Sequence, residues 1–181
     1  TEQAIVRDLG DVARAIEALH QLPLLHQLMR ISPLPDLQVE GLFVAMRSLL
    51  LENLDETEES AELTYFLSTL SLHCFTNEYV YFERVKESQR IDVFELKIRE
   101  ALSQSKQPKL LDVLSLAAYR PLHLYDWCEK LVVLDRLANV KERLIEQPLA
   151  EMVAKRDIPH LLAISNEVSH KVRAQYEESP Y

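Results

Sequence analysis

The residues that could do chemistry are concentrated in one short segment, Cys74 to Phe82, where four aromatic residues surround Asn77 and Glu78. Aromatic rings with polar handles beside a carboxylate can line a ligand pocket or a protein-docking surface. The pattern is also typical of a helix C-terminus whose rings pack into the core while Asn77 and Glu78 bond loop backbone. Because buried aromatic residues mostly serve packing, the structural interpretation is favoured and the functional one is the alternative.

The histidines and cysteines lack the spacing of a metal site. His20 and His26 are six positions apart across a predicted helix break, and His123 and Cys128 are five apart. Zinc sites on helices use two histidines four positions apart, and cysteine sites use pairs separated by two residues. We therefore expect no metal, and we expect both Cys74 and Cys128 to be core residues.

A nucleophile with its base could be assembled only from Ser71, His73 and Glu78, which are neighbours in sequence without a strained turn to expose a nucleophile. The chain contains two glycines. These cannot supply the glycine-rich loops that hold a dinucleotide or a nucleoside triphosphate. The sequence therefore predicts that this chain has no complete active site of its own.

Composition narrows the class of protein further. Of the 181 residues, 48% are hydrophobic, which is enough for a core, and the net charge of −9 argues against a nucleic-acid partner. Charged residues interrupt every apolar stretch before it reaches membrane-spanning length, so no membrane partner is expected. The two distant cysteines fit a reducing compartment. Together these features predict a soluble cytoplasmic protein.

Helix-forming residues dominate, and the scarcity of glycine disfavours hairpins. The sequence predicts an all-α fold, an irregular bundle of about nine helices without a sheet. The sequence also predicts that residues 1–181 form a single helical domain, which could consist of two sub-layers, 1–105 and 106–181. The clearest helix carries an apolar stripe at helical spacing, made of Leu63, Phe66, Leu67, Leu70 and Cys74.

Two helix starts are marked in the N-terminal third. Asp36 follows a proline-rich break and is placed to cap a strongly apolar helix that runs to about Asn53. Pro23 can begin the preceding helix. The residues of that helix predicted to face the core are Leu24, Leu25, Leu28 and Met29.

Three segments carry a resemblance: Cys74–Tyr81 (CFTNEYVY), Leu116–His123 (LAAYRPLH) and the tail Ile158–Tyr181, which contains the run Gln-Tyr-Glu-Glu-Ser-Pro-Tyr. In order and spacing they resemble bacterial methyltransferases of the tetratricopeptide-associated type. In that family a helical region lies between N-terminal tetratricopeptide repeats and a C-terminal class I methyltransferase domain that uses S-adenosylmethionine. The resemblance implies that this chain is a fragment of a larger protein, with those two regions as its partners.

The departures from the family pattern locate the catalytic machinery. Ser179 stands where the family has asparagine, and the chain ends at Tyr181, before the Pro-Arg-Trp of the family junction. The glycine-rich cofactor loop is absent, so the resemblance places S-adenosylmethionine binding elsewhere in the parent protein and implies no cofactor in this chain. It implies a linker, regulatory or substrate-presenting domain. Two alternatives are a stand-alone interaction module that docks a partner helix, and a small-molecule sensor with a cavity between helices.

Polar and aromatic groups at helix ends are the best candidates for binding, since helix interiors are used for packing. The candidate binding residues are Asn77, Glu78, Tyr79, Tyr119, Arg120 and His123. The candidate residues of a junction with the next domain are Gln175, Tyr176, Glu177 and Tyr181. The junction segment is predicted to be a helix capped by Ser165 and ordered to about Glu177, with Val168 and Val172 as its apolar stripe.

Overall fold

The computed structural model describes residues 9–156, 158 and 167–178, and every regular element within these ranges is a helix. The chain forms two compact units, residues 1–149 and 150–181. The all-α, irregular bundle predicted from the sequence is confirmed. The suggested sub-layers 1–105 and 106–181 are a different division and stay a prediction.

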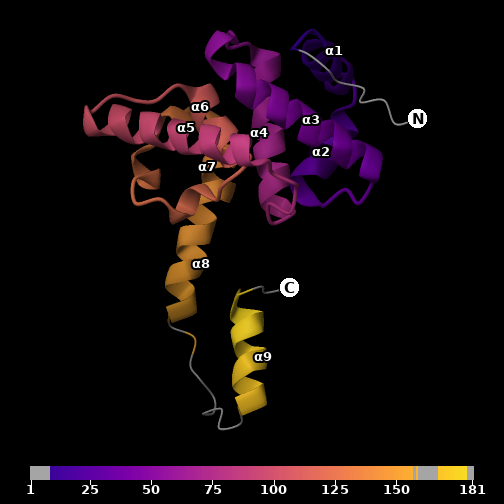
Figure 1. The fold of residues 1–181 in the computed structure, drawn as a ribbon. Coiled ribbons are helices and arrows are strands. Elements are labelled where there is room, and N and C mark those ends of the chain that lie inside the picture. The colour runs from indigo at the N-terminus through magenta and orange to yellow at the C-terminus, as the bar shows by residue number, and fades with distance from the viewer. Residues whose placement is uncertain (1–8, 157, 159–166, 179–181) are drawn as a thin grey trace. The chain divides into compact units, whose positions relative to one another are not determined.

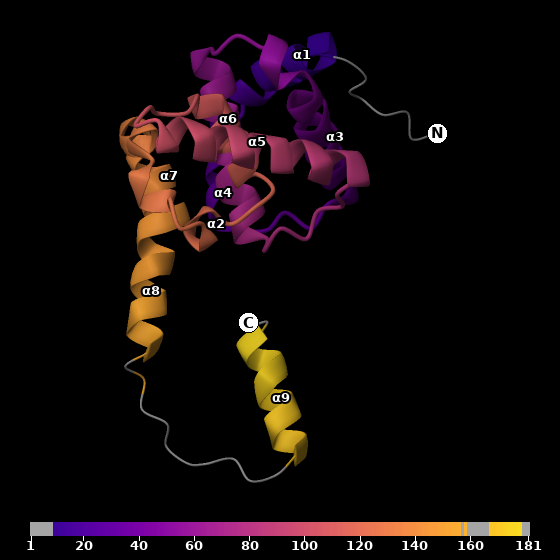
Figure 2. The same cartoon turned by 60° about the vertical axis from the view of Figure 1, so that its left-hand side comes forward.

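Six helices build most of the first unit, and α4 lies at its centre, in contact with α1, α2 and α6. The long helix α5 crosses the unit beside α3 and α6 (Figures 1 and 2). The helices are α1 (Leu9–His20), α2 (Pro23–Ile31), α3 (Leu37–Asn53), α4 (Ala61–Thr76), α5 (Val85–Ser103) and α6 (Leu110–Ala117).

Capping side chains begin the two central helices. The Asp36 carboxylate accepts hydrogen bonds from the backbone N–H groups of Gln38 and Val39, at 2.9 and 3.0 Å, as the sequence predicted. Ser60 caps α4 in the same way, because its hydroxyl accepts from the Leu63 N–H at 3.1 Å. Each such cap satisfies a backbone donor that the helix cannot, and losing one typically costs about 1 kcal/mol.

The apolar stripe of α4 is buried along its whole length, from Leu63 to Cys74, which confirms the prediction for this helix. Ser68, Thr69 and Ser71 on the remaining faces are buried as well. Their hydroxyls donate to carbonyl oxygens one turn earlier in the helix, which satisfies them inside the core. Both cysteines are also buried, as predicted.

The face of α2 differs from the prediction. Leu25 and Met29 turn inward, but Leu24 and Leu28 are exposed, and the exposed fraction of Leu24 is 72%. His26 takes the inward position, where its Nε2 lies 3.1 Å from the carbonyl oxygen of Leu19. Because His26 and Met29 face the core, the helix is rotated so that the Leu24–Leu28 edge lies on the surface.

The rest of the first unit is built from short helical turns. These are the 3-10 turns η2 (Leu122–Leu124), η3 (Cys128–Lys130) and η4 (Val132–Leu137), then α7 (Ala138–Lys141) and the π-helical turn η5 (Glu142–Glu146). Pro148 is the second residue of the next helix, α8 (Gln147–Arg156). Proline has no N–H for the carbonyl four residues earlier, and the π-turn η5 ends at Glu146, two residues before it.

The second unit contains the end of α8 and α9 (Glu167–Glu178). Helix α9 covers most of the predicted junction helix, while its proposed cap Ser165 and the terminal Tyr181 lie outside the described residues. Val172 and Tyr176 are exposed on it, and Arg173 forms an ion pair with Glu177 at 2.7 Å. Across the described ranges, no helix is long and apolar enough to cross a bilayer.

Candidate functional site

The candidate segment at Asn77 is the end of α4, closed by a Schellman motif. The N–H of Glu78 donates to the Phe75 oxygen at 3.1 Å, and the N–H of Tyr79 donates to the Cys74 oxygen at 2.8 Å. Glu78 and Tyr79 have φ angles of 57° and 59°. The first of these positions is usually glycine, because a left-handed conformation costs other residues about 1–2 kcal/mol. Two strained residues in succession therefore shape this loop.

The three residues at this helix end differ in exposure. Asn77 is buried, Glu78 is exposed, and Tyr79 is half-buried with a hydroxyl that has no hydrogen-bond partner. Burial raises the pKa of Tyr79, so its hydroxyl keeps its proton at neutral pH. The Phe75 ring lies 6.5 Å from the Tyr79 ring and 6.2 Å from the His123 ring, centroid to centroid. Phe75 thus joins His123 to the first candidate group.

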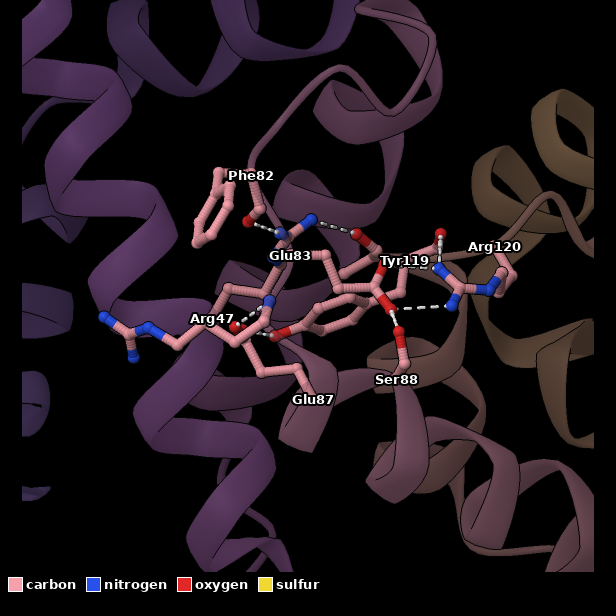
Figure 3. A network of polar contacts seen from close by, with 9 residues as sticks. Arg47, Phe82, Glu83, Glu87, Ser88, Tyr119 and Arg120 are labelled. Atoms are coloured by element: carbon pink, nitrogen blue, oxygen red, sulfur yellow. Dashed lines mark hydrogen bonds and ion pairs between the residues drawn. The ribbon is translucent and has the colours of Figure 1, made fainter.

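A buried arginine on α3 links the two segments that carry the family resemblance in the first unit. Arg47 is 3% exposed, and it donates to the Ala118 oxygen at 3.1 Å and to the Phe82 oxygen at 2.9 Å. Its guanidinium carbon lies 3.9 Å from the centroid of the Tyr119 ring, and Figure 3 shows Arg47 beside this tyrosine. The same carbon lies 5.8 Å from the centroid of the Tyr81 ring. Arg47 therefore holds both segments through their backbones and their rings.

A buried carboxylate completes this network at the start of α5. Glu87 accepts from the Tyr119 hydroxyl at 2.7 Å and from the Arg84 backbone N–H at 2.9 Å, which also caps the helix (Figure 3). Burial raises the pKa of Tyr119, and its bond to Glu87 acts in the same direction. Arg47 above the ring lowers it. The phenol therefore stays protonated and bridges a carboxylate and a guanidinium.

Arg120 makes the second ionic contact between these segments. Its two terminal nitrogens lie 2.6 and 2.7 Å from the two carboxylate oxygens of Glu83, a bidentate pair, and Ser88 donates to the same carboxylate (Figure 3). The bond from Arg120 is the largest cause that lowers the pKa of Glu83. The pair is partly exposed, so its contribution to stability is at most modest.

His73 makes a separate pair of buried hydrogen bonds that connect α4 to α2 and to the loop after α4. Its Nδ1 lies 3.1 Å from the Met29 carbonyl oxygen and its Nε2 lies 2.7 Å from the Tyr81 hydroxyl. Because a carbonyl only accepts, Nδ1 carries the proton and Nε2 accepts from Tyr81. Burial lowers the pKa of His73, which keeps the ring neutral.

These contacts leave no activated nucleophile at this end of α4. The Ser71 hydroxyl lies 2.7 Å from the Leu67 oxygen and 2.9 Å from the Leu114 oxygen, and both nitrogens of His73 are engaged. Burial raises the pKa of Cys74 to about 11, so it remains a thiol. In the described part of the chain, no three histidine, cysteine or acidic residues are grouped to hold a metal ion.

Three large apolar side chains are exposed between α4 and the first residue of α5. Val80, Phe82 and Val85 are 73%, 69% and 74% exposed, and they lie in the segment 78–85, which we call the 78–85 loop. Neighbouring large apolar side chains exposed together are typical of an interaction surface. Beneath the loop, Arg47 holds the Phe82 carbonyl and Arg120 holds Glu83.

The structure thus brings the six candidate binding residues into two adjoining clusters. Asn77, Glu78 and Tyr79 adjoin His123 through Phe75, whereas Tyr119 and Arg120 bind acidic residues at the start of α5. Gln175, Tyr176 and Glu177 lie on α9, in the other unit, and Tyr181 lies outside the described residues.

Sequence reasoning missed Arg47, the residue that organises these clusters. The signal was present, since Arg47 is the only basic residue in the 17-residue, otherwise mostly apolar helix α3. A single charge among core residues must find partners when the helix is buried. Glu87 was missed as well, because α5 carries many charged residues and the sequence does not distinguish the buried one.

No family model matches this chain, and no curated protein or solved structure matches it either.

Proposed function

We propose that this chain is a helical docking domain of a bacterial, cytoplasmic methyltransferase-like protein that uses S-adenosylmethionine. In this proposal the chain has no catalytic activity of its own. The 78–85 loop contacts the methyltransferase domain of the same protein and so positions that domain and its substrate.

The observation that carries the proposal is the Arg47 contact between the two resembling segments. Cys74–Tyr81 and Leu116–His123 lie far apart in the sequence, yet one guanidinium stacks on a tyrosine of each and bonds a carbonyl in or next to each. Such a network fixes the backbone of the loop without using the outward side chains. A preorganised surface loses less conformational entropy on binding, which favours a docking role.

The outward side chains suit a protein partner. Phe82 combines a large apolar area with a backbone already held by Arg47. Aromatic residues, phenylalanine included, are enriched at protein interfaces. The strained Glu78 and Tyr79 direct the loop away from the axis of α4. The chain lacks a glycine-rich loop, so the methyl donor belongs to the partner domain in this proposal.

The test uses the parent protein with Phe82→Ser, and with Leu96→Ser as its matched control, because Leu96 is an equally exposed apolar residue on α5. We expect Phe82→Ser to lower the rate of methyl transfer by about tenfold, the effect of losing roughly 1.4 kcal/mol of contact energy. Leu96→Ser should leave it unchanged, and both variants should keep the melting temperature. Equal rates in the two variants would contradict the docking role of the loop.

Two further measurements separate this proposal from its alternatives. Calorimetry on the isolated chain should detect no binding of S-adenosylmethionine, and saturable binding in the low micromolar range would overturn the proposal. The coding sequence after position 181 should encode a methyltransferase domain. Its absence would instead favour a stand-alone interaction module, in which the same loop binds a separate protein.

A further inference from the structure

A groove on the other side of α4 is independent of the 78–85 loop. Its volume is about 530 Å³, and it lies between α2, α4 and the η4–α7 segment. Leu72, Leu137 and Val140 contribute apolar wall, whereas Arg30, Tyr65 and Ser68 contribute polar groups. The groove therefore has the mixed lining of a small-molecule site: mostly apolar, with a few polar groups at fixed positions.

Arg30 is the charged group of this groove, and its guanidinium lies 5.0 Å from the centroid of the Tyr65 ring. Its single side-chain hydrogen bond is a long one, 3.4 Å to the Thr69 hydroxyl, and its Nε is buried without a partner. In residues 9–156, no carboxylate lies within ion-pair distance of Arg30. A guanidinium normally finds an anion or several acceptors when it leaves water, so this one has unused donors.

The surrounding charges add to the positive potential at this end of the groove. Arg143 donates to the Arg30 carbonyl oxygen at 3.4 Å, and no described carboxylate forms an ion pair with it either. Arg136 and Glu59 are both in the lining and pair with each other at 2.6 Å, so they cancel and Arg30 is the uncompensated charge of the lining. The His26 ring lies 4.8 Å from the Tyr65 ring, centroid to centroid, in a tilted arrangement, and burial lowers the pKa of His26, so it adds no charge at neutral pH. A protein of net charge −9 thus presents a local cationic site.

We propose that this groove binds a small organic anion whose carboxylate or phosphate group pairs with Arg30. Its apolar body lies along Tyr65, Leu72 and Val140. The planar fork of arginine matches both head groups in bidentate geometry. The Tyr65 ring holds the fork in one orientation, which reduces the entropy lost on binding. The Ser68 hydroxyl, whose proton is used on the Thr64 carbonyl oxygen at 2.6 Å, retains lone pairs for a donor on the ligand.

A second cavity provides an internal comparison. It has a volume of about 590 Å³ and lies between α1 and the start of α4. Val12 and Ile16 form part of its apolar floor, while Glu17, Glu58 and Glu62 supply exposed carboxylates around it. Negative charge there disfavours an anion of any size. The proposal therefore predicts that anionic probes select the Arg30 groove over this larger cavity.

The test is methyl NMR of the whole chain during titration with phenylacetate, phenyl phosphate and, as the cation of similar size, 2-phenylethylammonium. We expect saturable shifts of the Leu72, Leu137 and Val140 methyl groups with at least one anion, and smaller shifts at Val12 and Ile16. The cation should leave the groove unchanged. Preference between the two anions identifies the head group as a carboxylate or a phosphate.

Three variants connect the binding to Arg30. Arg30→Gln should weaken the preferred anion by about tenfold or more, since a charge-assisted bond is roughly twice as strong as a neutral one. The affinity of Arg30→Lys should lie between those of the original chain and Arg30→Gln, because lysine keeps the charge but lacks the planar fork of arginine. The matched control is Arg90→Gln, because Arg90 also lies above an aromatic ring, that of Phe94, but is paired with Asp55 and lies outside the groove lining. Unchanged affinity in Arg30→Gln, equal loss in the control, or equal response to the cation would overturn the proposal.

Discussion

Two arginines of this chain lie above tyrosine rings, and their surroundings are opposite. Arg47 is enclosed between α3, α6 and the 78–85 loop, and its terminal nitrogens bond two carbonyl oxygens. Arg30 lines an open groove, and its terminal nitrogens make one long hydrogen bond to a side chain. The Nε of each arginine has no partner, so the difference lies in the terminal nitrogens, which make two short bonds at Arg47 and one long bond at Arg30.

This difference separates a structural role from a binding role. A buried charge is tolerated only where it has hydrogen-bond partners, so the two short backbone bonds of Arg47 indicate that the fold depends on this residue. A partly buried charge with spare donors is stabilised further when an anion arrives, so the single long bond at Arg30 favours a ligand. The following predictions test this contrast, beginning with the largest effect.

Replacing each arginine by methionine should give very different losses of stability. Arg47→Met leaves the Ala118 and Phe82 carbonyls without donors and removes the cation above Tyr119, so we expect a loss of about 3–5 kcal/mol. Arg30→Met should cost less than about 1 kcal/mol, because methionine keeps most of the apolar contact. Urea unfolding measures both. Similar losses in the two variants would remove the distinction.

The hydroxyl of Tyr119 tests the enclosed network with a smaller change. Tyr119→Phe keeps the ring beside Arg47 but removes the donor to the buried Glu87 carboxylate. We expect a loss of about 1.5–3 kcal/mol, the range for a hydrogen bond to a charged group. The control is Tyr65→Phe. The Tyr65 ring also lies under an arginine, Arg30, but its hydroxyl makes no hydrogen bond within residues 9–156, so this variant should lose less stability. If Tyr119→Phe lost no stability, the Glu87 carboxylate would have another hydrogen-bond donor in place of Tyr119.

The contrast also explains what the sequence could reveal. The apolar stripe of α4 and the cap at Asp36 follow from local spacing, and both were predicted correctly. The inward turn of His26 and the burial of Arg47 depend on partners distant in sequence, such as the carbonyl of Ala118. Hydropathy assigns both residues to the surface. Local patterns predict helices well, whereas long-range hydrogen bonds decide which face is buried.

The candidate residues were found for a related reason. Asn77 and Tyr119 stand next to breaks in helical periodicity, and such breaks are visible in the sequence. That Phe75 joins Tyr79 to His123 could not be predicted, because it requires the packing of α4 against the segment after α6. The groove at Arg30 was not predicted either, since its walls come from three separated segments.

The buried His73 should make the stability of the protein depend on pH. Burial lowers the pKa of His73 from its ordinary value of 6.5, so below that pH the unfolded chain binds a proton that the folded chain does not. The contribution of His73 is therefore complete above about pH 6.5 and is lost as the pH falls. His73→Gln should flatten this decline in urea unfolding between about pH 7 and 5. An unchanged slope would contradict a neutral His73.

The smallest expected effect concerns the strain at the end of α4, where Glu78 has a φ of 57°. Glycine adopts this conformation without the steric cost, which is about 1–2 kcal/mol, but it also makes the unfolded chain more flexible. We therefore expect Glu78→Gly to raise the free energy of unfolding by roughly 0.5–1 kcal/mol. Ser105→Gly is the matched control, because Ser105 has the same φ of 57° in the turn after α5, away from the 78–85 loop.

Comparing the two glycine variants shows whether the strain at Glu78 serves docking. If both gain stability and only Glu78→Gly slows methyl transfer in the parent protein, the fixed direction of the 78–85 loop is required for the proposed contact. The physical reason is that glycine widens the range of loop conformations and raises the entropy lost on binding. Equal activity in the two variants would show that Glu78 serves only to end α4, as Ser105 serves to end α5.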